Sequence, residues 1–302
     1  MLKKLSYILI FICIAVEGYS QYEIPRLSQY LINGLVVNPA YAGSREALSS
    51  ASVAKFYYSG FEGSPSTYKF GLHSPLKNDK IALGVTVENY NNPSYSNTGA
   101  YAHYAYRIWL GGFRLSMGLK AGFFQYKENN DGLDLLNTQD PLFVNETGFS
   151  PNFGAGLYLY NNKFFAGLSV PYFLNLPDSG RDINFDTRSY HYILTLGYLY
   201  EVSENVKLKP SALIDYSVSG LDVQAGTNFI LMDDKLWLGA LYRTSSRALT
   251  GIIEVQLSSW LRLGYAYDYS FTNLSNVSNG THEIMLRWEL NFESNAESPL
   301  YF

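Results

Sequence analysis

Apolar and polar side chains alternate strictly in the stretch THEIMLRWELNF near the C-terminus. Because neighbouring residues of a β-strand point to opposite faces, this stretch predicts a strand with one apolar face and one mixed face. The apolar face carries Ile284, Leu286, Trp288, Leu290 and Phe292, and the other carries Met285, Arg287, Glu289 and Asn291. Such a strand needs an apolar environment along the whole of its apolar face.

The same period of two recurs along the chain and predicts about fourteen strands. The predicted strands lie near residues 46–59, 65–74, 79–90, 98–109, 112–126, 151–160, 163–173, 188–201, 205–217, 221–231, 235–244, 247–257, 260–271 and 280–292. Strands of about 10 to 14 residues are longer than the usual five or six of soluble sheets, and they suit a tilted membrane crossing.

The connections between the predicted strands alternate between short and long. The short ones lie at 77–79, 110–111, 161–162, 203–204, 233–234 and 258–259, and long ones lie at 91–97, 127–150, 172–187 and 272–279. In an up-and-down antiparallel sheet, alternate connections lie at opposite ends. One end of the sheet therefore carries the short connections and the other end carries the long ones. This asymmetry is typical of outer-membrane barrels, which have short periplasmic turns and longer extracellular loops.

These patterns predict an all-β fold, a closed up-and-down antiparallel transmembrane β-barrel of about fourteen strands. An open sheet edge inside a bilayer leaves backbone N–H and C=O groups unsatisfied, so the sheet has to close. The apolar face of each strand then meets lipid, and the small and polar alternates face the lumen. The alternative is a large secreted β-sandwich with an aromatic core.

Composition supports a barrel and argues against other classes. The chain has 27 Tyr, 18 Phe and 25 Gly, whereas charged residues make up only 16%, against about a quarter in typical domains. The net charge of −4 comes without a basic block, which argues against nucleic acid as a partner. Beyond the N-terminal leader, no stretch reaches the roughly 18 consecutive apolar residues of a transmembrane helix.

The first residues predict a signal peptide over residues 1–20. Two lysines precede an apolar stretch from Tyr7 to Val16, and small residues at positions 18 and 20 predict cleavage before Gln21. The single cysteine, Cys13, lies within this stretch, so the mature chain has no disulfide and no thiolate ligand for a metal.

Three parts follow the signal peptide: a periplasmic N-terminal segment over 21–45, the barrel over 46–292 and a periplasmic C-terminal tail over 293–302. An even number of strands places both termini on the periplasmic side of the outer membrane. In the N-terminal segment, Leu27, Tyr30, Leu31 and Leu35 have helical spacing, which Asn38-Pro39 ends. We expect this segment to cap or enter the periplasmic mouth of the barrel. The alternative is a lead-in with no role beyond targeting.

Candidate catalytic and metal-binding groups are scattered along the sequence. No pair of histidines has the spacing of metal ligands, and all four lie in separate predicted strands: His73, His103, His191 and His282. Where a histidine adjoins a serine, threonine or glutamate, the two side chains point to opposite faces and cannot act as nucleophile and base. We therefore predict no cofactor, no metal site and no enzymatic activity.

The longest predicted loop, around residues 128–143, is both acidic and apolar. Asp131, Asp134 and Asp140 could bind calcium, but the EF-hand spacing is missing, so a solvated surface loop is favoured. Long loops are usually functional, and apolar side chains on them indicate contact with protein. The predicted partner-binding residues are Leu133, Leu135, Leu136 and Phe143.

Two stretches resemble a known family. They are SQYLINGLVVNPAYAGSREALS, residues 28–49, which continues in residues 61–76, and LRLGYAYDYSFTNLSNVSNGTHEIMLRWEL, residues 261–290. Together they are similar to the PorP/SprF family of type IX secretion system membrane proteins, and the resemblance extends over the mature chain. The motif residues are Asn38, Pro39, Tyr41, Gly43, Tyr267, Asp268, Tyr269, His282 and Glu283. One departure is Gly34-Leu35-Val36-Val37, where the family more often has bulkier aromatic or polar residues.

The resemblance implies an outer-membrane barrel of the type IX secretion and gliding machinery. It implies a large secreted type IX cargo or adhesin as partner, together with periplasmic components of the machinery, and it implies no enzymatic activity and no cofactor. The predicted function is therefore to bind, anchor or assist the export of a large secreted surface protein. The alternative is a passive or substrate-selective pore through a lumen lined by small residues.

Overall fold

The computed structural model describes residues 27–30, 33–76, 79–129, 145–174, 187, 190–273 and 277–290. Two short helical turns, α2 (Gly34–Val37) and η1 (Pro39–Tyr41), precede the strands. The strands are β1 (Leu48–Phe56), β2 (Ser66–Pro75), β3 (Ile81–Asn91), β4 (Tyr95–Leu110), β5 (Phe113–Glu128), β6 (Thr147–Tyr160), β7 (Phe164–Val170), β8 (Tyr192–Tyr198), β9 (Tyr200–Ser203), β10 (Val206–Ser217), β11 (Gly220–Leu231), β12 (Leu236–Arg243), β13 (Ala248–Ser258), β14 (Leu261–Ser270) and β15 (Thr281–Leu290). Neither described helix is long and apolar enough to cross a membrane. The predicted signal peptide and the C-terminal tail lie outside the described residues.

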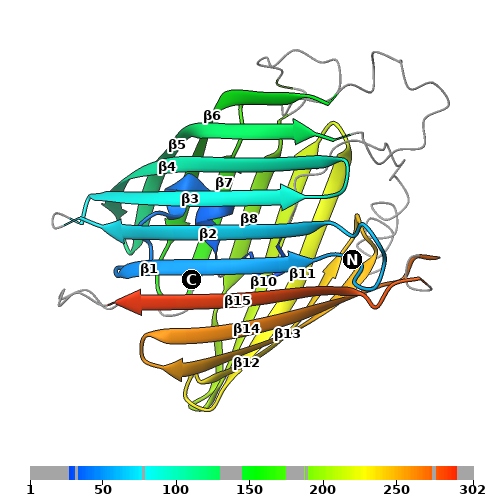
Figure 1. Cartoon of the computed structure of the whole chain (residues 1–302). Coiled ribbons are helices and arrows are strands. Elements are labelled where there is room, and N and C mark those ends of the chain that lie inside the picture. The colour runs from blue at the N-terminus through cyan, green and yellow to red at the C-terminus, as the bar shows by residue number, and fades with distance from the viewer. Residues whose placement is uncertain are drawn as a thin grey trace, which may run out of the picture.

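The strands form one antiparallel sheet that closes on itself (Figure 1). Neighbouring strands pair in chain order, and β1 pairs with β15, the first strand with the last. Because β8 and β9 both pair with β10, they occupy one position, and the 15 segments form a barrel of 14 strands. The predicted fold class and strand number are confirmed.

The break between β8 and β9 falls opposite a proline. Ser211 pairs with Gly197 and Leu208 pairs with Tyr200, so Pro210 stands across from the break. Proline has no N–H to donate to the ladder, which interrupts the pairing. The sequence predicts a single strand over 188–201 because the alternation of side chains continues through the break.

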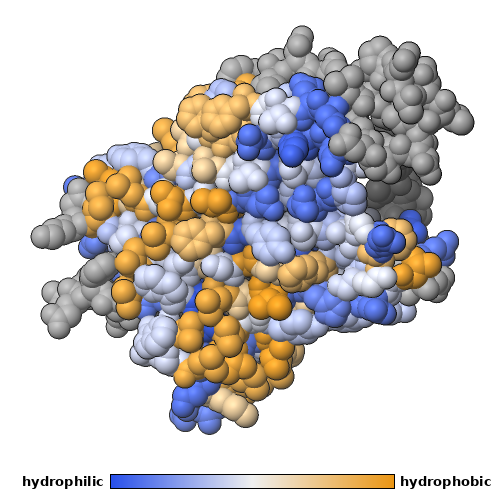
Figure 2. Space-filling view, viewed as in Figure 1, coloured by the Kyte–Doolittle hydropathy of each residue, from blue (hydrophilic) through white to orange (hydrophobic). Residues whose placement is uncertain are grey.

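Side chains alternate between the outer surface and the lumen as the sequence predicts. In β15, Ile284, Leu286 and Leu290 are exposed by 51%, 39% and 48%, whereas Met285 is fully buried. Figure 2 shows orange apolar side chains gathered across the outer surface, with hydrophilic residues towards one end. The apolar face of the C-terminal strand therefore meets lipid and not a protein core.

The barrel has two unlike ends, which we call the short-turn end and the long-loop end. Connections at the short-turn end are 76–80, 111–112, 161–163, 204–205, 232–235 and 259–260. The long-loop end carries 57–65, 129–146, 171–191 and 271–280, besides three short turns. The expected loop over 91–97 is one of these short turns. Asn92 Oδ1 accepts hydrogen bonds from the N–H groups of Ser94 and Tyr95 at 3.0 and 2.7 Å, which lets β3 and β4 continue to a tight turn.

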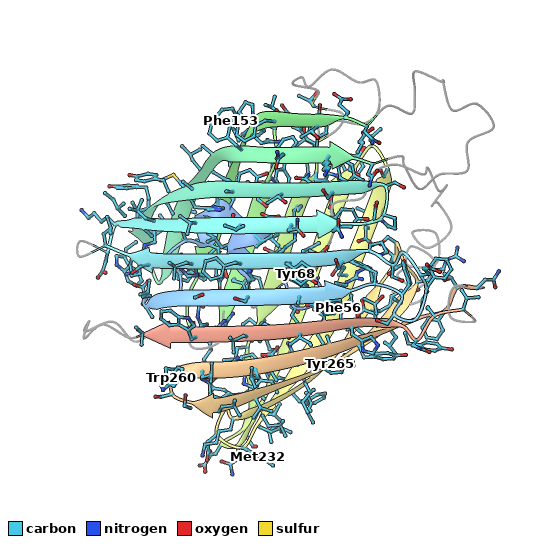
Figure 3. The ribbon with its side chains drawn as sticks, viewed as in Figure 1. Phe56, Tyr68, Phe153, Met232, Trp260 and Tyr265 are labelled. Atoms are coloured by element: carbon cyan, nitrogen blue, oxygen red, sulfur yellow. The ribbon has the colours of Figure 1, made fainter. Side chains whose placement is uncertain are left out.

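Aromatic side chains mark both ends of the outer surface (Figure 3). Trp260 lies in the β13–β14 turn at the short-turn end and is half exposed. Phe56 and Tyr68 lie towards the long-loop end, where their rings meet edge to face at 6.0 Å. Aromatic girdles of this kind flank the apolar band of outer-membrane barrels.

Candidate functional site

The N-terminal segment lies inside the barrel. We call its described residues, 27–30 and 33–47, the lumenal segment, and nearly all of them are buried. Ser28 contacts Asp268 and Glu283 towards the long-loop end, and Arg45 contacts Glu289 near the short-turn end. The segment therefore crosses the lumen from the long-loop end to the short-turn end, with its helical turns enclosed by the strands (Figure 1).

This position differs from the periplasmic location expected for residues 21–45. Leu27 packs against Ala51, Val53 and Met285 inside the barrel, near the end that carries the long loops. Burial of these apolar side chains favours the lumen over an aqueous location. Among the described residues before Asn38, the α-helical turn spans Gly34–Val37.

Charged side chains converge on Ser28, and we call the group Ser28, Lys55, Arg243, Asp268 and Glu283 the Ser28 cluster. Lys55 Nζ lies 3.1 Å from Asp268 and 3.3 Å from Glu283, and it donates to Ser28 Oγ at 3.0 Å. Arg243 lies 3.4 Å from Asp268 and also donates to Ser28 Oγ at 3.0 Å. Buried charges are tolerated when they are paired and hydrogen-bonded, and this cluster meets both conditions.

Glu283 binds the main chain of the lumenal segment. Its two carboxylate oxygens accept the N–H groups of Ser28 and Gln29, both at 2.8 Å. Ser28 Oγ donates to Asp268 Oδ1 at 3.0 Å across 240 sequence positions. The two stretches that carry the family resemblance therefore meet in the lumen.

Asn38 and Pro39 form the turn in the middle of the lumenal segment. The Asn38 side chain accepts the N–H of Ala40 at 2.9 Å and caps η1, where proline is favoured in the first turn. Asn38 Nδ2 donates to the Leu157 carbonyl of the wall at 2.8 Å. A Cβ on Gly118 would collide with the backbone of Pro39 and Ala40, so the wall needs glycine at this position.

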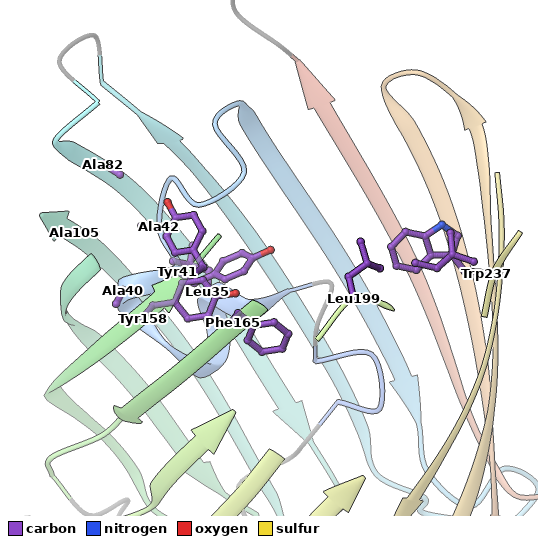
Figure 4. Packing of buried hydrophobic residues seen from close by; sticks show 12 residues of the cluster. Leu35, Ala40, Tyr41, Ala42, Ala82, Ala105, Tyr158, Phe165, Leu199 and Trp237 are labelled. Carbon is purple, nitrogen blue, oxygen red and sulfur yellow. The ribbon is translucent and has the colours of Figure 1, made fainter. Parts of the chain in front are cut away.

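Tyr41 anchors the segment in an aromatic and aliphatic cluster (Figure 4). Its ring packs edge to face on His73 at 5.4 Å and on Tyr158 at 5.5 Å. Gly43 follows with a φ of +74°, which favours glycine, and its N–H donates to His73 Nδ1 at 3.0 Å. The NPAYAG motif is thus a sequence of specific contacts with the lumen wall.

Three ion pairs hold the segment at the short-turn end. Arg45 binds Glu289 through two nitrogens at 2.7 and 2.9 Å, a bidentate geometry that strengthens the pair. Glu46 contacts Arg114 and lies 2.8 Å from Arg107. Charged groups therefore fix the lumenal segment at both ends.

Further charged side chains of the wall stack on aromatic rings. Lys120 Nζ lies 4.1 Å from the ring centre of Tyr101 and 3.7 Å from that of Tyr172. Trp237 has Arg262 over its ring at 4.0 Å and Lys209 at 5.0 Å. Cation–π contacts of this kind lower the cost of burying a charge.

The structure divides the family-motif residues between two environments. Asn38, Pro39, Tyr41, Gly43, Asp268 and Glu283 lie in the lumen. Tyr267, Tyr269 and His282 lie on the outer side of the wall, where His282 Nδ1 is 2.7 Å from Tyr265 Oη. The predicted partner-binding residues Leu133, Leu135, Leu136 and Phe143 lie outside the described residues.

Ser28, Arg45, Lys55 and Arg243 are not among the residues that the sequence motifs predict for the site. Their signal in the sequence was weak. The alternation places Lys55 on the lumen side of its strand, but alternation does not show which charges meet. Among the described residues, no group of three His, Cys, Asp or Glu side chains is arranged to hold a metal.

The family described as type IX secretion system membrane protein PorP/SprF matches residues 19–288. The CymD monoaromatic hydrocarbon channel is similar in structure with a TM-score of 0.55 and 11% identity, covering 87% of this chain and 94% of that one. The Ralstonia pickettii toluene transporter TbuX has a TM-score of 0.53 and 9% identity, covering 93% and 100%. At such identities these likenesses concern the fold alone. No curated protein matches the chain in sequence.

Proposed function

Because the chain belongs to the PorP/SprF family of type IX secretion system membrane proteins, we propose that this outer-membrane barrel binds, anchors or assists the export of a large secreted surface protein. The observation that carries the proposal is the lumenal segment, which occupies the lumen. Ion pairs hold it at the short-turn end, and hydrogen bonds to charged side chains of the Ser28 cluster hold it at the long-loop end. A filled lumen suits a barrel that holds a partner better than one that conducts solutes.

The client contacts the long-loop end in this proposal. Loops 129–146 and 171–191 are the longest connections there. A standard interface buries about 800 Å² on each partner, more than one loop tip offers, so several loops contribute. Leu133, Leu135, Leu136 and Phe143 supply the apolar contacts, since exposed apolar side chains favour association with protein.

The orientation follows from the same asymmetry. We place the short-turn end in the periplasm, where it is available to periplasmic components of the secretion machinery, and the long loops outside the cell. Leu290, the last residue of β15, lies at the short-turn end, so we also propose a periplasmic location for the C-terminal tail.

A pore is the second candidate function. It is favoured by a small cavity beside the lumenal segment, lined by residues that include Gly34, Val37, Tyr158, Phe165 and Thr195, and by the fold shared with a transporter and a channel. Conduction requires the segment to leave the lumen. Single-channel recording in planar bilayers distinguishes the two functions. A barrel that binds a client and keeps the lumenal segment in place gives no steady conductance.

Deletion of the gene tests the proposal. We expect the cells to lose one large protein from their exterior while unrelated type IX cargo is still secreted. Mass spectrometry of proteins shaved from intact cells measures both. A complete surface proteome together with lost uptake of a small solute supports the pore instead.

A further inference from the structure

Four side chains of the lumen wall bind main-chain groups of the lumenal segment. They are Glu283 on the N–H groups of residues 28 and 29, Ser169 on the carbonyl of residue 37, and His73 and Arg107 on the N–H and carbonyl of residue 43. These hydrogen bonds are 2.6 to 3.0 Å long. Main-chain groups are common to all polypeptides, so these four contacts do not themselves depend on the side chains of the bound segment.

Several polar side chains of the segment are bound less well than its main chain. The side-chain amide of Gln29, the hydroxyl of Tyr41 and the hydroxyl of Ser44 are buried without a hydrogen-bond partner among the described residues. Buried polar groups in proteins normally have partners. The wall therefore binds the main chain of the segment at these positions more completely than it binds these three side chains.

The wall also leaves room for a polypeptide. Gly118 lets the backbone at Ala40 approach, and a Cβ on Gly84 would stand only 3.0 Å from the Leu35 side chain. A small cavity also borders the segment at Gly34 and Val37. Glycine at such positions permits close approach of another backbone.

We propose that the lumen is a binding site for a polypeptide segment, that the lumenal segment occupies it at rest, and that a segment of the secreted client replaces it. The inference rests on the proposed function. Ser28 lies towards the long-loop end, so a client outside the cell enters by the same opening. The covalent link to β1 gives the lumenal segment a high effective concentration in the lumen. A client that is already bound to the loops gains a comparable effective concentration.

The first experiment displaces the lumenal segment from the lumen of the full-length protein. Ala40 is fully buried against Gly118, so Ala40→Arg does not fit and displaces the segment while the wall stays unchanged. The probe is a fluorescent synthetic peptide with the sequence of residues 27–47. We expect saturable binding to the A40R barrel at least about tenfold tighter than to the wild type, whose site is filled by its tethered segment.

A peptide carrying the same Ala40→Arg change is the matched control and should not bind. A heat-modifiable, folded A40R barrel that binds no peptide overturns the inference. Equal binding of both peptides overturns it as well, because it shows adsorption outside the lumen.

The second experiment locks the segment in place. A Cβ on residue 71 would stand 3.5 Å from Cγ of Asn33, which is the position that Sγ of a cysteine at residue 33 would occupy, so cysteines at the two positions come within reach of a disulfide. We expect the N33C/G71C pair, when oxidised, to abolish attachment of the surface protein that gene deletion removes, and a reductant to restore it. Asn33→Cys alone is the control. Full attachment of the surface protein in the oxidised state overturns the proposed replacement of the lumenal segment by the client. This second experiment tests the inference even if the A40R barrel does not assemble.

The two experiments separate this inference from the proposed function. Peptide binding needs no client, so it tests the lumen alone. If gene deletion leaves the surface proteome complete, the proposed function fails while the peptide result stands. If deletion removes the client but the folded A40R barrel binds no peptide, the proposed function stands with the loops as its site, and the lumenal inference is wrong.

Discussion

Lys55 of β1 pairs in register with Glu283 of β15, and its Nζ lies 3.3 Å from the Glu283 carboxylate. This contact crosses the seam at which the first and last strands of the barrel join. The same carboxylate accepts the N–H groups of Ser28 and Gln29. Closure of the barrel and binding of the lumenal segment therefore share one buried ion pair.

Loss of Lys55 should destabilise the barrel strongly. Lys55→Met leaves Asp268 and Glu283 with Arg243 as the nearest cation of the Ser28 cluster, and removing one partner of a buried pair costs about 3–5 kcal/mol. Lys163→Met is the control, since the Lys163–Glu201 pair is 54% exposed on both sides and such pairs contribute about 0–1 kcal/mol. Urea unfolding in lipid vesicles, followed by tryptophan fluorescence, measures the difference. Equal midpoints for the two variants would contradict the role of the cluster.

A charge on the outer face should be costly only at mid-depth. Leu286 lies in the middle of β15 and Leu290 at its end, and both face outward. Leu286→Arg should cost about 2–4 kcal/mol and Leu290→Arg about 0–1 kcal/mol, because the penalty falls towards the membrane interface. The yield of heat-modifiable barrel after refolding reports the effect. If both variants assemble equally well, the assigned membrane depth is incorrect.

The close approach of the lumenal segment makes Gly118 sensitive to a single added methyl group. Gly118→Ala places a Cβ against the backbone of Pro39 and Ala40, and overpacking of this kind costs about 1–3 kcal/mol. Gly251→Ala adds a Cβ with no atom within 4 Å, so its effect should stay within about 0.5 kcal/mol. Differential scanning calorimetry of both variants tests the contrast, and similar melting temperatures would argue against a tightly packed segment.

Epitope tags should reveal which end of the barrel is outside the cell. Tags at Asn162 and Asp234, in turns at the short-turn end, should be inaccessible to antibody on intact cells. Tags at positions 136 and 179, within the two longest connections, should be labelled. Permeabilised cells, in which all four tags should react, provide the control. The reverse labelling pattern would invert the topology.

Replacement of the longest loop should weaken attachment of the client without preventing assembly. A short Gly/Ser linker in place of residues 130–145 removes Leu133, Leu135, Leu136 and Phe143, and with them apolar surface that contributes about 25 cal/mol per Å² buried. Quantitative proteomics of the cell surface measures the client. Substituting the three aspartates of the loop by asparagine is the control for charge. A client retained in full by the linker variant would exclude the loop as its binding site.

The sequence determined the wall of the barrel. Alternation within each strand assigned Leu286 to the lipid face and Met285 to the lumen, because side-chain direction in a strand depends only on local backbone geometry. Connection lengths also distinguished the two ends, because the number of residues between two strands can be read from the sequence. The prediction was wrong for the connection over 91–97, where the Asn92 side chain closes a tight turn.

The tertiary structure alone decided what occupies the lumen. The spacing of Leu27, Tyr30 and Leu35 indicated a short helix but gave no sign that strands would enclose it. The N–H of Ser28 donates to the carboxylate of Glu283, 255 positions away. The alternation of residues along the chain carries no information about such a contact. Only closure of β1 onto β15 gathers the wall glycines and the buried charges around residues 27–47, because they come from many strands that are far apart in the sequence.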